Sequence, residues 1–556
     1  MTIGLLSTFA GLAAAELIVG LVRGANSPVV PVGQEVIDIV PPAVKDLAID
    51  WFGTADKAVL IIGTLLSLAV VGSIVGNLAV KGNRSSAYAV TVVVGVIGVF
   101  AVQMRPAPTV GKMLPTIVGT VVSLLVVWWI SPRDVGMLVR PVDSEAVYEV
   151  VRQAEQPDAV RLEPERAGTG PILGSLFATT VKRRNFLQAA STVGLVSVTA
   201  AGIGRILKGR FDVGGERAAL EIPPPVDTLP PFGALPGADP GSGIQSASAA
   251  ITDFGIDGVE PWLVPNKNFY RIDTALVVPQ VSKDSWKLRI HGMVDRELEI
   301  TFADLLERDM IERFITLSCV SNRIGGDLVG NVRWQGVRLK DVLDEAGVQP
   351  EATQVVSRSI DGWNCGSPTS AIMDGRDAIL AIAMNGEPLP AEHGYPVRLV
   401  VPGLYGYVSA TKWVTEIELT RWEDFDGYWI KRNWSKEGPV KTMARIDTPR
   451  RRRGYRADSG GVVDIAGLAW AVHRGVSKVE VSIDDGEWRE CEVAGVPSDD
   501  TWRQWRYQWT KPPPGRHNVR ARAYDGAGVA QPEEPKRVAP DGAQGYHRVE
   551  FEVETS

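Results

Sequence analysis

The sequence has few of the residues that build disulfide frameworks and soft metal centres. Only three cysteines (Cys319, Cys365 and Cys491) occur among its 556 residues, and none lies in a CxxC or CxxCH pattern. Three cysteines cannot form a disulfide framework, and no zinc cluster, iron–sulfur cluster or c-type haem site is visible. Histidine is also scarce: none of the five precedes His291, so the N-terminal region cannot supply the two ligands of a b-type haem.

An excess of basic residues is lacking as well. The net charge is −7, and the sequence pI is near 5.5. These values argue against a nucleic-acid partner, which requires a basic face. The chain is too long for one hydrophobic core, so several domains are expected.

Charged residues are almost absent from four N-terminal stretches of membrane-spanning length. The stretches cover about residues 3–22, 58–80, 87–102 and 113–130, and they are rich in Gly, Ala, Val and Leu. Small residues allow helices to pack closely in a bilayer. Glu16 is the exception; it is either a partly solvated or helix-facing carboxylate or, less commonly, part of a transport path. Residues 1–131 are therefore predicted to form a four-helix transmembrane domain.

A fifth apolar stretch covers residues 182–207 and begins with three basic residues. The sequence Thr180-Val-Lys-Arg-Arg-Asn-Phe-Leu-Gln188 resembles a twin-arginine export signal, and the alternative is an ordinary membrane anchor with its positive charges in the cytoplasm. Cleavage near residues 199–202 is left open, and retention as a fifth transmembrane helix is favoured. In either case, the rest of the chain is expected outside the cytoplasm.

Lysine and arginine near the other helix ends set the orientation of the spans. With residues 182–184 inside, the loop at 81–84 and the N-terminus also lie inside, and the loop at 23–56 lies outside. The loop at 105–112 falls outside although it is basic, a weak violation of the positive-inside rule. The expected location is a multi-pass position in the plasma membrane.

Composition divides the remainder of the chain. Residues 132–181 are polar and are predicted to be a cytoplasmic connector, and residues 208–250 are predicted to be a Pro/Gly-rich linker. Between residues 251 and 438, mixed elements predict an α+β domain, with an alternating strand at 286–290 and a capped helix at 301–307. Residues 439–556 are predicted to form an immunoglobulin-like β-sandwich, because five stretches with strand patterning are separated by turn signals. These stretches are 462–471, 478–483, 502–509, 518–524 and 547–553.

Three blocks of sequence in the α+β domain carry candidate chemistry. They are Leu317-Ser-Cys-Val-Ser-Asn-Arg-Ile324; Ala383-Met-Asn-Gly-Glu-Pro-Leu-Pro390 with Glu392-His-Gly-Tyr-Pro-Val-Arg398; and Val401-Pro-Gly-Leu-Tyr-Gly406 running to Lys412-Trp413. A lone cysteine in an apolar setting is most often part of the core, but a redox metal centre needs a soft thiolate such as that of Cys319. His393, Arg398 and Lys412 lie on Gly/Pro-rich loops and could cradle a phosphate, because glycine lets the backbone approach an anion. Together, these features suit a phosphorylated organic cofactor.

The joint pattern of these blocks resembles the sulfite oxidase family of molybdopterin-dependent oxidoreductases, in a membrane-anchored bacterial type, over roughly residues 251–554. The resemblance implies a molybdenum–molybdopterin cofactor, with Cys319 as the molybdenum ligand and Arg323 as a second catalytic residue. It also implies that the C-terminal sandwich is a dimerisation-type domain, so a homodimer is one expectation. The residues implied to bind the cofactor are Asn268, Tyr270, Arg271, Cys319, Asn322, Asp361, Ser367, His393, Arg398 and Lys412.

The sequence departs from the family's pattern near the substrate. The family's second arginine after Asn-Arg is here Ile324, and its active-site tyrosine, two residues before Met-Asn-Gly, is here Ile382. A pterin-contacting histidine is replaced by Asp273, and Arg474 lies one place from an anion-binding arginine. Loss of a cation that binds a divalent oxyanion removes a charge-assisted contact of about 1.5–3 kcal/mol. These replacements argue against sulfite as the substrate.

The features combine into one functional prediction: a membrane-anchored molybdenum–molybdopterin oxidoreductase with an extracytoplasmic catalytic domain. We expect oxygen-atom transfer, with electrons exchanged with a separate carrier protein or quinone-linked partner, because no haem-binding domain precedes the catalytic domain. Two alternatives stay open: a reductase of sulfoxides or other oxyanions, and a non-catalytic membrane scaffold with a relic cofactor domain.

Overall fold

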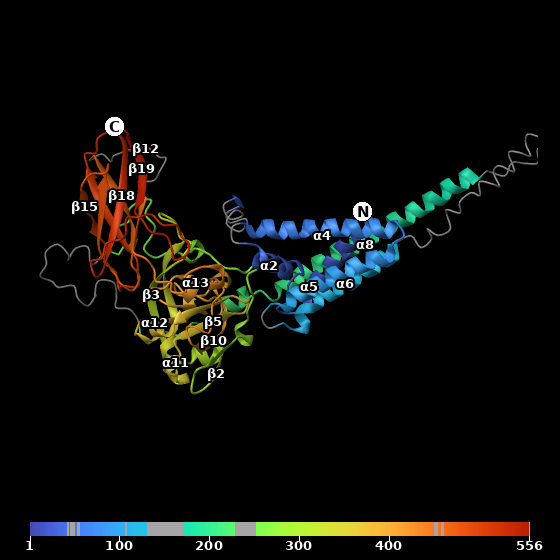
Figure 1. Cartoon of the computed structure of the whole chain (residues 1–556), viewed down its shortest axis with the longest axis horizontal. Coiled ribbons are helices and arrows are strands. Elements are labelled where there is room, and N and C mark those ends of the chain that lie inside the picture. Colours follow the sequence, from blue (N-terminus) through green and yellow to red (C-terminus); the bar gives the residue numbers. More distant parts are fainter. Residues whose placement is uncertain are drawn as a thin grey trace, which may run out of the picture. The chain divides into compact units, whose positions relative to one another are not determined.

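The computed structural model describes residues 1–41, 44, 51–52, 56–105, 108–130, 171–227, 252–449, 454–456 and 461–554. The chain forms two compact units, Met1–Asp212 and Val213–Ser556 (Figure 1). The first unit is helical, and the second contains four β-sheets with short helices between the strands. The predicted order of a helical region, an α+β region and a β-sandwich is confirmed.

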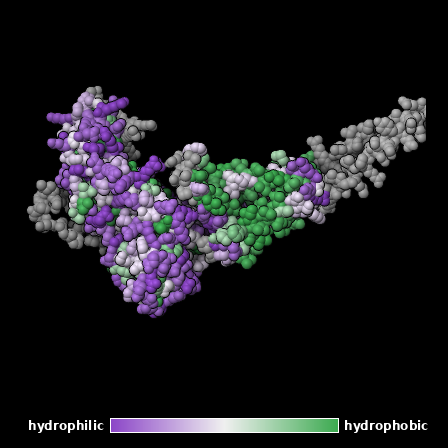
Figure 2. Space-filling view, in the orientation of Figure 1, coloured by the Kyte–Doolittle hydropathy of each residue, from purple (hydrophilic) through white to green (hydrophobic). Residues whose placement is uncertain are grey.

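Apolar helices make up the first unit, and their bounds follow the hydrophobic stretches of the sequence. The described helices are α1 (Thr2–Leu21), α2 (Val29–Ile39), α4 (Asp56–Val80), α5 (Arg84–Gln103), α6 (Val110–Ile130) and α8 (Pro171–Gly209). Five candidate membrane spans coincide with these helices, all except α2, and hydrophobic residues cover most of the face of this unit in Figure 2. Helix α8 begins inside the predicted connector, whose residues 132–170 lie outside the described part of the chain.

Helix α1 packs against three other helices through glycine residues. A Cβ atom on each α1 glycine would clash with the backbone of the facing glycine, so only glycine allows these approaches. The facing pairs are Gly4 with Gly72 of α4, Gly11 with Gly119 of α6, and Gly20 with Gly204 of α8. The fifth apolar helix is therefore packed into the same helical unit as the first four.

The loop after α5, which is basic in sequence, carries an internally paired charge. Arg105 lies just beyond the end of α5, and its guanidinium forms ion pairs with Glu35 and, at 3.0 Å, with Asp38 Oδ2. Both carboxylates belong to α2, the shorter helix between α1 and α4. The charge of Arg105 is therefore compensated within the helical unit.

Two five-stranded sheets form the α+β part of the second unit. One has the strand order β2-β1-β10-β5-β6, and the other has β3-β4-β7-β8 with β9 paired to β7. The strands are β1 (Lys287–Gly292), β2 (Leu298–Thr301), β3 (Met310–Ser318), β4 (Val329–Arg338), β5 (Gln354–Ser359), β6 (Asn364–Pro368), β7 (Ile379–Met384), β8 (Glu387–Pro388), β9 (Arg398–Val400) and β10 (Val414–Thr420). The predicted strand and capped helix are both present, the latter as α10 with its Thr301–Asp304 capping box.

Short helices connect these strands. They are α9 (Gly214–Ala218), η2 (Asn266–Asn268), η3 (Lys283–Ser285), α10 (Phe302–Leu306), α11 (Leu339–Ala346), α12 (Thr369–Met373), η4 (Ala391–His393), α13 (Gly406–Ser409) and η5 (Ile430–Arg432). Several of the loops around η2, η4 and α13 carry the predicted site residues, so the sheets act as the scaffold that fixes those loops.

The C-terminal part is the predicted β-sandwich. Its two sheets have the orders β11-β13-β17-β16 and β12-β19-β18-β14-β15. The strands are β11 (Met443–Thr448), β12 (Gly454–Arg456), β13 (Val462–Trp470), β14 (Val476–Ile483), β15 (Trp488–Glu490), β16 (Glu492–Val493), β17 (Arg503–Thr510), β18 (Gly515–Asp525) and β19 (His547–Glu554). All five predicted strands are present, and the inner faces bury one hydrophobic core between the sheets.

The first part of the predicted linker is built into the second unit. Val213 is buried, and the backbone of residues 226–227 pairs with strand β3: the N–H of Val226 donates to Met310 O at 2.9 Å, and the N–H of Glu312 donates to Asp227 O at 3.0 Å. This short pairing covers the open edge of the β3 sheet. Residues 228–251, the rest of the linker, lie outside the described residues.

Candidate active site

Cys319 immediately follows strand β3 and lies in the wall of a pocket. Its backbone N–H donates to Leu328 O at 2.9 Å, and its Sγ atom accepts the N–H of Ser321 at 3.4 Å. Burial raises the pKa of the Cys319 thiol, and the hydrogen bond from Ser321 opposes that rise only in part. A thiol in this setting becomes a thiolate readily when a metal ion supplies the positive charge.

The pocket brings together loops from both sheets. Its empty volume, counted out to the solvent, is about 900 Å³. Of the predicted site residues, Tyr270, Cys319, Asp361, His393, Arg398 and Lys412 line it. The sequence separates these side chains by up to 142 residues (412 − 270), yet the fold places them around one cavity.

Arg398 lines this pocket and has unmet hydrogen-bonding capacity. Its Nη1 atom donates to His393 O at 3.2 Å, and its guanidinium lies 4.9 Å from the centre of the Trp334 ring. Its Nε atom is buried and has no hydrogen-bond partner among the described residues. Burial lowers the pKa of Arg398 to about 10, so the group remains charged at neutral pH. A buried guanidinium with an unused donor fits an anionic group of a cofactor.

His393 and Lys412 complete the basic part of the pocket. Burial, together with the nearby Arg398 and Lys412, lowers the pKa of His393 to about 3, so its imidazole is neutral at pH 7. Burial likewise lowers the pKa of Lys412 to about 8. The Nζ atom of Lys412 lies 2.8 Å from Asp273 Oδ2, and the same oxygen accepts the Nε–H of Arg271 at 2.7 Å.

Tyr270 and Asp361 lie on the loops that flank these cations. The Tyr270 ring stacks on Phe269 with ring centres 5.0 Å apart, and burial raises the pKa of its hydroxyl. Burial also raises the pKa of the Asp361 carboxyl, whose Oδ1 atom accepts the N–H of Trp363 at 3.1 Å. Burial thus disfavours the ionised form of both groups, and both can hydrogen-bond a heterocyclic ligand.

The other predicted residues lie outside the pocket wall. Asn322 Oδ1 accepts the N–H of Leu328 at 3.1 Å and braces the loop after Cys319. Ser367 Oγ donates to Val408 O at 2.6 Å and fixes α13 beneath the pocket. The remaining three are Asn268 and Arg323, which are exposed, and Arg271, whose guanidinium is bound to Asp273.

Aromatic side chains that sequence reasoning did not single out line another part of the pocket. Tyr407, Trp429 and Trp434 are in edge or tilted contact, with ring centres 6.0 Å apart for Tyr407–Trp434 and 6.1 Å apart for Trp429–Trp434. The Tyr407 hydroxyl donates to Ser435 O at 2.6 Å, which ties the segment that carries both tryptophans to α13. The richness of the sequence in tryptophan is the one signal of this wall, and it does not indicate which rings face the pocket.

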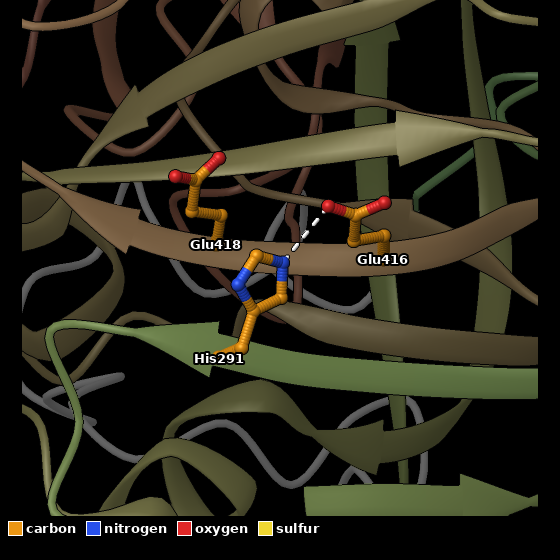
Figure 3. Close-up of side chains that lie close together, drawn as sticks. All are labelled: His291, Glu416 and Glu418. Carbon is orange, nitrogen blue, oxygen red and sulfur yellow. Dashed lines mark hydrogen bonds and ion pairs between the residues drawn. The ribbon is translucent and has the colours of Figure 1, made fainter. Parts of the chain in front are cut away.

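A second cluster of possible metal ligands is already paired with an arginine side chain. His291, Glu416 and Glu418 project toward one another from strands β1 and β10 (Figure 3). His291 Nε2 lies 2.8 Å from Glu416 Oε1, but Arg358 donates to both carboxylates. A guanidinium already supplies the compensating positive charge, so this cluster is an ion-pair network on the sheet surface.

Comparison with known proteins agrees with the pocket chemistry. The family model described as "oxidoreductase molybdopterin binding domain" matches residues 275–429. Sulfite oxidase of Gallus gallus is 30% identical over 345 residues, which cover 54% of this chain and 71% of that protein. The uncharacterized oxidoreductase YuiH of Bacillus subtilis is 34% identical over 178 residues, which cover 31% of this chain and 86% of that protein.

Among solved structures, the sulfane dehydrogenase SoxCD from Paracoccus pantotrophus aligns with 54% of this chain and 85% of that chain, at 23% identity and a TM-score of 0.46. The sequence relatives are the more informative comparison, because two of them reach 30% identity over most of their own length. The residues matched by the family model include Cys319, Arg398 and Lys412 of the pocket, and a molybdopterin cofactor is typical of such proteins. The chain belongs to the sulfite oxidase family of molybdopterin-dependent oxidoreductases.

Proposed function

We propose that this protein is a membrane-anchored molybdenum–molybdopterin enzyme that transfers oxygen atoms on the extracytoplasmic side. The main support is the placement of the Cys319 thiol in the same pocket as the unused Arg398 donor and the Lys412 ammonium. When bound, the molybdenum cofactor supplies the two-electron redox change, and the protein binds, orients and encloses it.

The side chains around the pocket have distinct proposed roles. The Cys319 thiolate ligates the metal, and Arg398 and Lys412 bind the anionic part of the cofactor. Neutral His393 lines the pocket and can hydrogen-bond the pterin through a ring nitrogen. Asn322 and Ser367 act indirectly, because their hydrogen bonds fix the loops that carry or face Cys319.

The role of Cys319 is tested by metal analysis of the full-length protein and of Cys319→Ser. A hydroxyl is a harder and poorly ionised donor, so we expect this variant to fold but to lose its turnover and the spectroscopic signature of the cysteine–metal bond. Cys365→Ser and Cys491→Ser are matched controls, since both thiols are also buried but lie outside the pocket wall. Full activity of Cys319→Ser, or absence of molybdenum and pterin from the wild type, would refute the proposed function.

The proposed orientation rests on the basic residues before the fifth span. Lys182, Arg183 and Arg184 favour a cytoplasmic flank, and the same segment is proposed to use the twin-arginine route for export. Packing of Gly204 against α1 supports retention of α8 after export. Reporter fusions after Gly215 should be active only outside the cytoplasm, and mass spectrometry of the mature chain should find α8 still attached. Cytoplasmic reporter activity would overturn the orientation.

The aromatic wall favours an organic substrate within this reaction class. Tyr407, Trp429 and Trp434 offer ring faces rather than charges, so a sulfoxide or another molecule with an uncharged group suits the pocket better than a small dianion. Reduction of a sulfoxide is therefore the second candidate reaction. We further propose that electrons pass to or from a separate carrier protein or quinone-linked partner and that the C-terminal sandwich supports a homodimer.

A further inference from the structure

One carboxylate lies among the cations of the pocket. Asp273 lines the cavity with only 3% of its side chain exposed, and its Oδ2 atom accepts hydrogen bonds from Lys412 Nζ and Arg271 Nε at 2.8 and 2.7 Å. A buried negative charge repels an anionic ligand and is costly to desolvate. Its presence beside the cations that are proposed to bind an anionic ligand therefore needs a compensating benefit.

The hydrogen bonds of Lys412 show what that benefit is. An ammonium group has three donors. One is used by Asp273, and a second by Glu392 O at 3.1 Å. Nζ also lies 4.8 Å from the centre of the Trp413 ring. These contacts hold the side chain, which is 10% exposed, in one orientation and leave its third donor for a ligand in the pocket.

The charges around Lys412 also indicate that Asp273 benefits this side chain. Burial lowers the pKa of Lys412, and the nearby Arg398 and Arg271 lower it further. Asp273 is the group that opposes both effects. Asp273 thus favours the charged, hydrogen-bonding form of the ammonium in an environment that would otherwise favour the neutral amine.

We propose that Asp273 is a positioning residue that stays bound to Lys412 when the cofactor is in place and directs the ammonium toward the anionic part of the cofactor. The inference rests on the proposed function of the pocket as the cofactor site. The alternative is that Asp273 only neutralises the cations and competes with the cofactor for them. The positioning role predicts faster release of the cofactor when the charge of Asp273 is removed, and the alternative predicts slower release.

The test compares cofactor retention in full-length, detergent-solubilised protein. Molybdenum per chain is measured by mass spectrometry and pterin by the fluorescence of its oxidised form, during prolonged dialysis. Asp273→Asn keeps the size of the side chain but removes its charge, and we expect its cofactor to be released about tenfold faster than from the wild type. Asp273→Ser carries the same expectation should the asparagine variant fail to fold, and Asp273→Glu should restore retention in part.

A double-mutant cycle separates positioning from a general structural effect. If Asp273 acts through Lys412, Asp273→Asn combined with Lys412→Gln should release cofactor no faster than Lys412→Gln alone. Asp377→Asn is the matched control, because this carboxylate also bridges two arginines, Arg313 and Arg338, but lies outside the pocket wall. We expect it to alter stability and leave cofactor retention unchanged.

The outcomes distinguish this inference from the proposed function. Slower release from Asp273→Asn shows that the carboxylate competes with the cofactor, and equal release shows that it does not affect cofactor binding. Additive effects in the double variant show that it does not act through Lys412. Each of these results overturns the positioning role alone. A wild-type protein without molybdenum and pterin overturns the proposed function and this inference with it.

Discussion

The indole Nε1–H of Trp262 donates to the backbone oxygen of Trp502 at 3.2 Å, and the indole Nε1–H of Trp502 donates to the backbone oxygen of Trp262 at 2.9 Å. Both rings are buried. The backbone N–H of Trp502 also donates to Thr316 Oγ1 at 2.8 Å on strand β3, which leads directly to Cys319. This contact joins the C-terminal sandwich to the strand that positions the proposed metal ligand.

Substitution of Trp502 should therefore destabilise both parts of the second unit together. Trp502→Ala creates a large cavity and is expected to lower the free energy of unfolding by about 3–5 kcal/mol. Trp502→Phe fills much of the cavity but loses the indole donor, so a smaller loss of about 1–3 kcal/mol is expected. Denaturant unfolding of the full-length protein checks both values. Trp488→Ala is the control, because this ring lies on β15 and is only partly buried; an equal loss in the control would contradict the interface role.

Much of the fold follows from local patterns, and its exceptions have a physical cause. Thr301 and Asp304 form the capping box that their spacing predicts, and strand β19 begins at the predicted residue, His547. Strand β11 was missed because all six of its residues are buried, so it shows no alternation. Its Arg445 and Asp447 form a buried ion pair at 2.6 Å, which in the sequence reads as polar surface.

The residues of the candidate site, like the elements of the fold, could be predicted from the sequence only in part. Motif resemblance identified Cys319, Arg398 and Lys412, and the structure places all three around one pocket. Sequence reasoning gave no sign that Asp273 would pair with Lys412, because a contact between side chains 139 residues apart is set by the tertiary fold. The positions of Trp429 and Trp434 were missed for a similar reason: they lie on a segment without regular periodicity, where spacing does not reveal which face is inward.

Close packing between α1 and α8 gives a second prediction. A Cβ atom on Gly204 would clash with the backbone of Glu16, whereas a Cβ atom on Gly202 of the same helix has no neighbour within 4 Å. Gly204→Leu should therefore separate the two helices and lower the thermal unfolding midpoint of the detergent-solubilised protein, and Gly202→Leu should leave it nearly unchanged. Equal behaviour of the two leucine variants would show that α8 is not packed in this way.

The buried imidazole of His393 predicts a pH-dependent stability in protein produced without cofactor. The pKa of His393 is lowered from 6.5 to about 3, mainly by burial. Between these values the unfolded chain binds a proton that the folded chain excludes, so the free energy of unfolding falls as the pH is lowered from 6.5 toward 3, by up to about 1.4 kcal/mol per pH unit. Stability above pH 6.5 is not affected by this group.

Unfolding midpoints of the wild type and of His393→Gln, measured between pH 4 and 7, isolate this contribution. The variant should lose stability less steeply as the pH falls. Burial also lowers the pKa of His547 to about 4, but that group is present in both proteins and cancels in the comparison. Parallel profiles would contradict a neutral, buried His393.

Sulfite should be a poor substrate, and the structure refines the reason. Neither Ile324 nor Ile382 lines the described pocket: Ile382 is fully buried in strand β7, and Ile324 packs near Gly545 of the sandwich. The two replacements thus remove a cation and a hydroxyl without adding apolar walls. The arginine and the lysine in the pocket wall, Arg398 and Lys412, are the groups that are proposed to bind the cofactor.

Arg474, which lies one place from the family's anion-binding arginine, is a candidate for a substrate cation, and its hydrogen bonds hold it in place. Its guanidinium donates to Val440 O and Thr442 Oγ1, both at 3.0 Å, and to Asp525 Oδ2 at 3.3 Å. Moving it toward Cys319 would break these bonds. With no cation of its own, a doubly charged anion loses its hydration without compensation. Steady-state kinetics with sulfite and an artificial acceptor should therefore give a kcat/KM far below the value of about 10⁶ M⁻¹s⁻¹ that is ordinary for a natural substrate. An organic sulfoxide, assayed with a reduced electron donor, should be turned over faster than sulfite. A sulfite kcat/KM near that ordinary value would mean that Arg474 or another cation reaches the substrate after all.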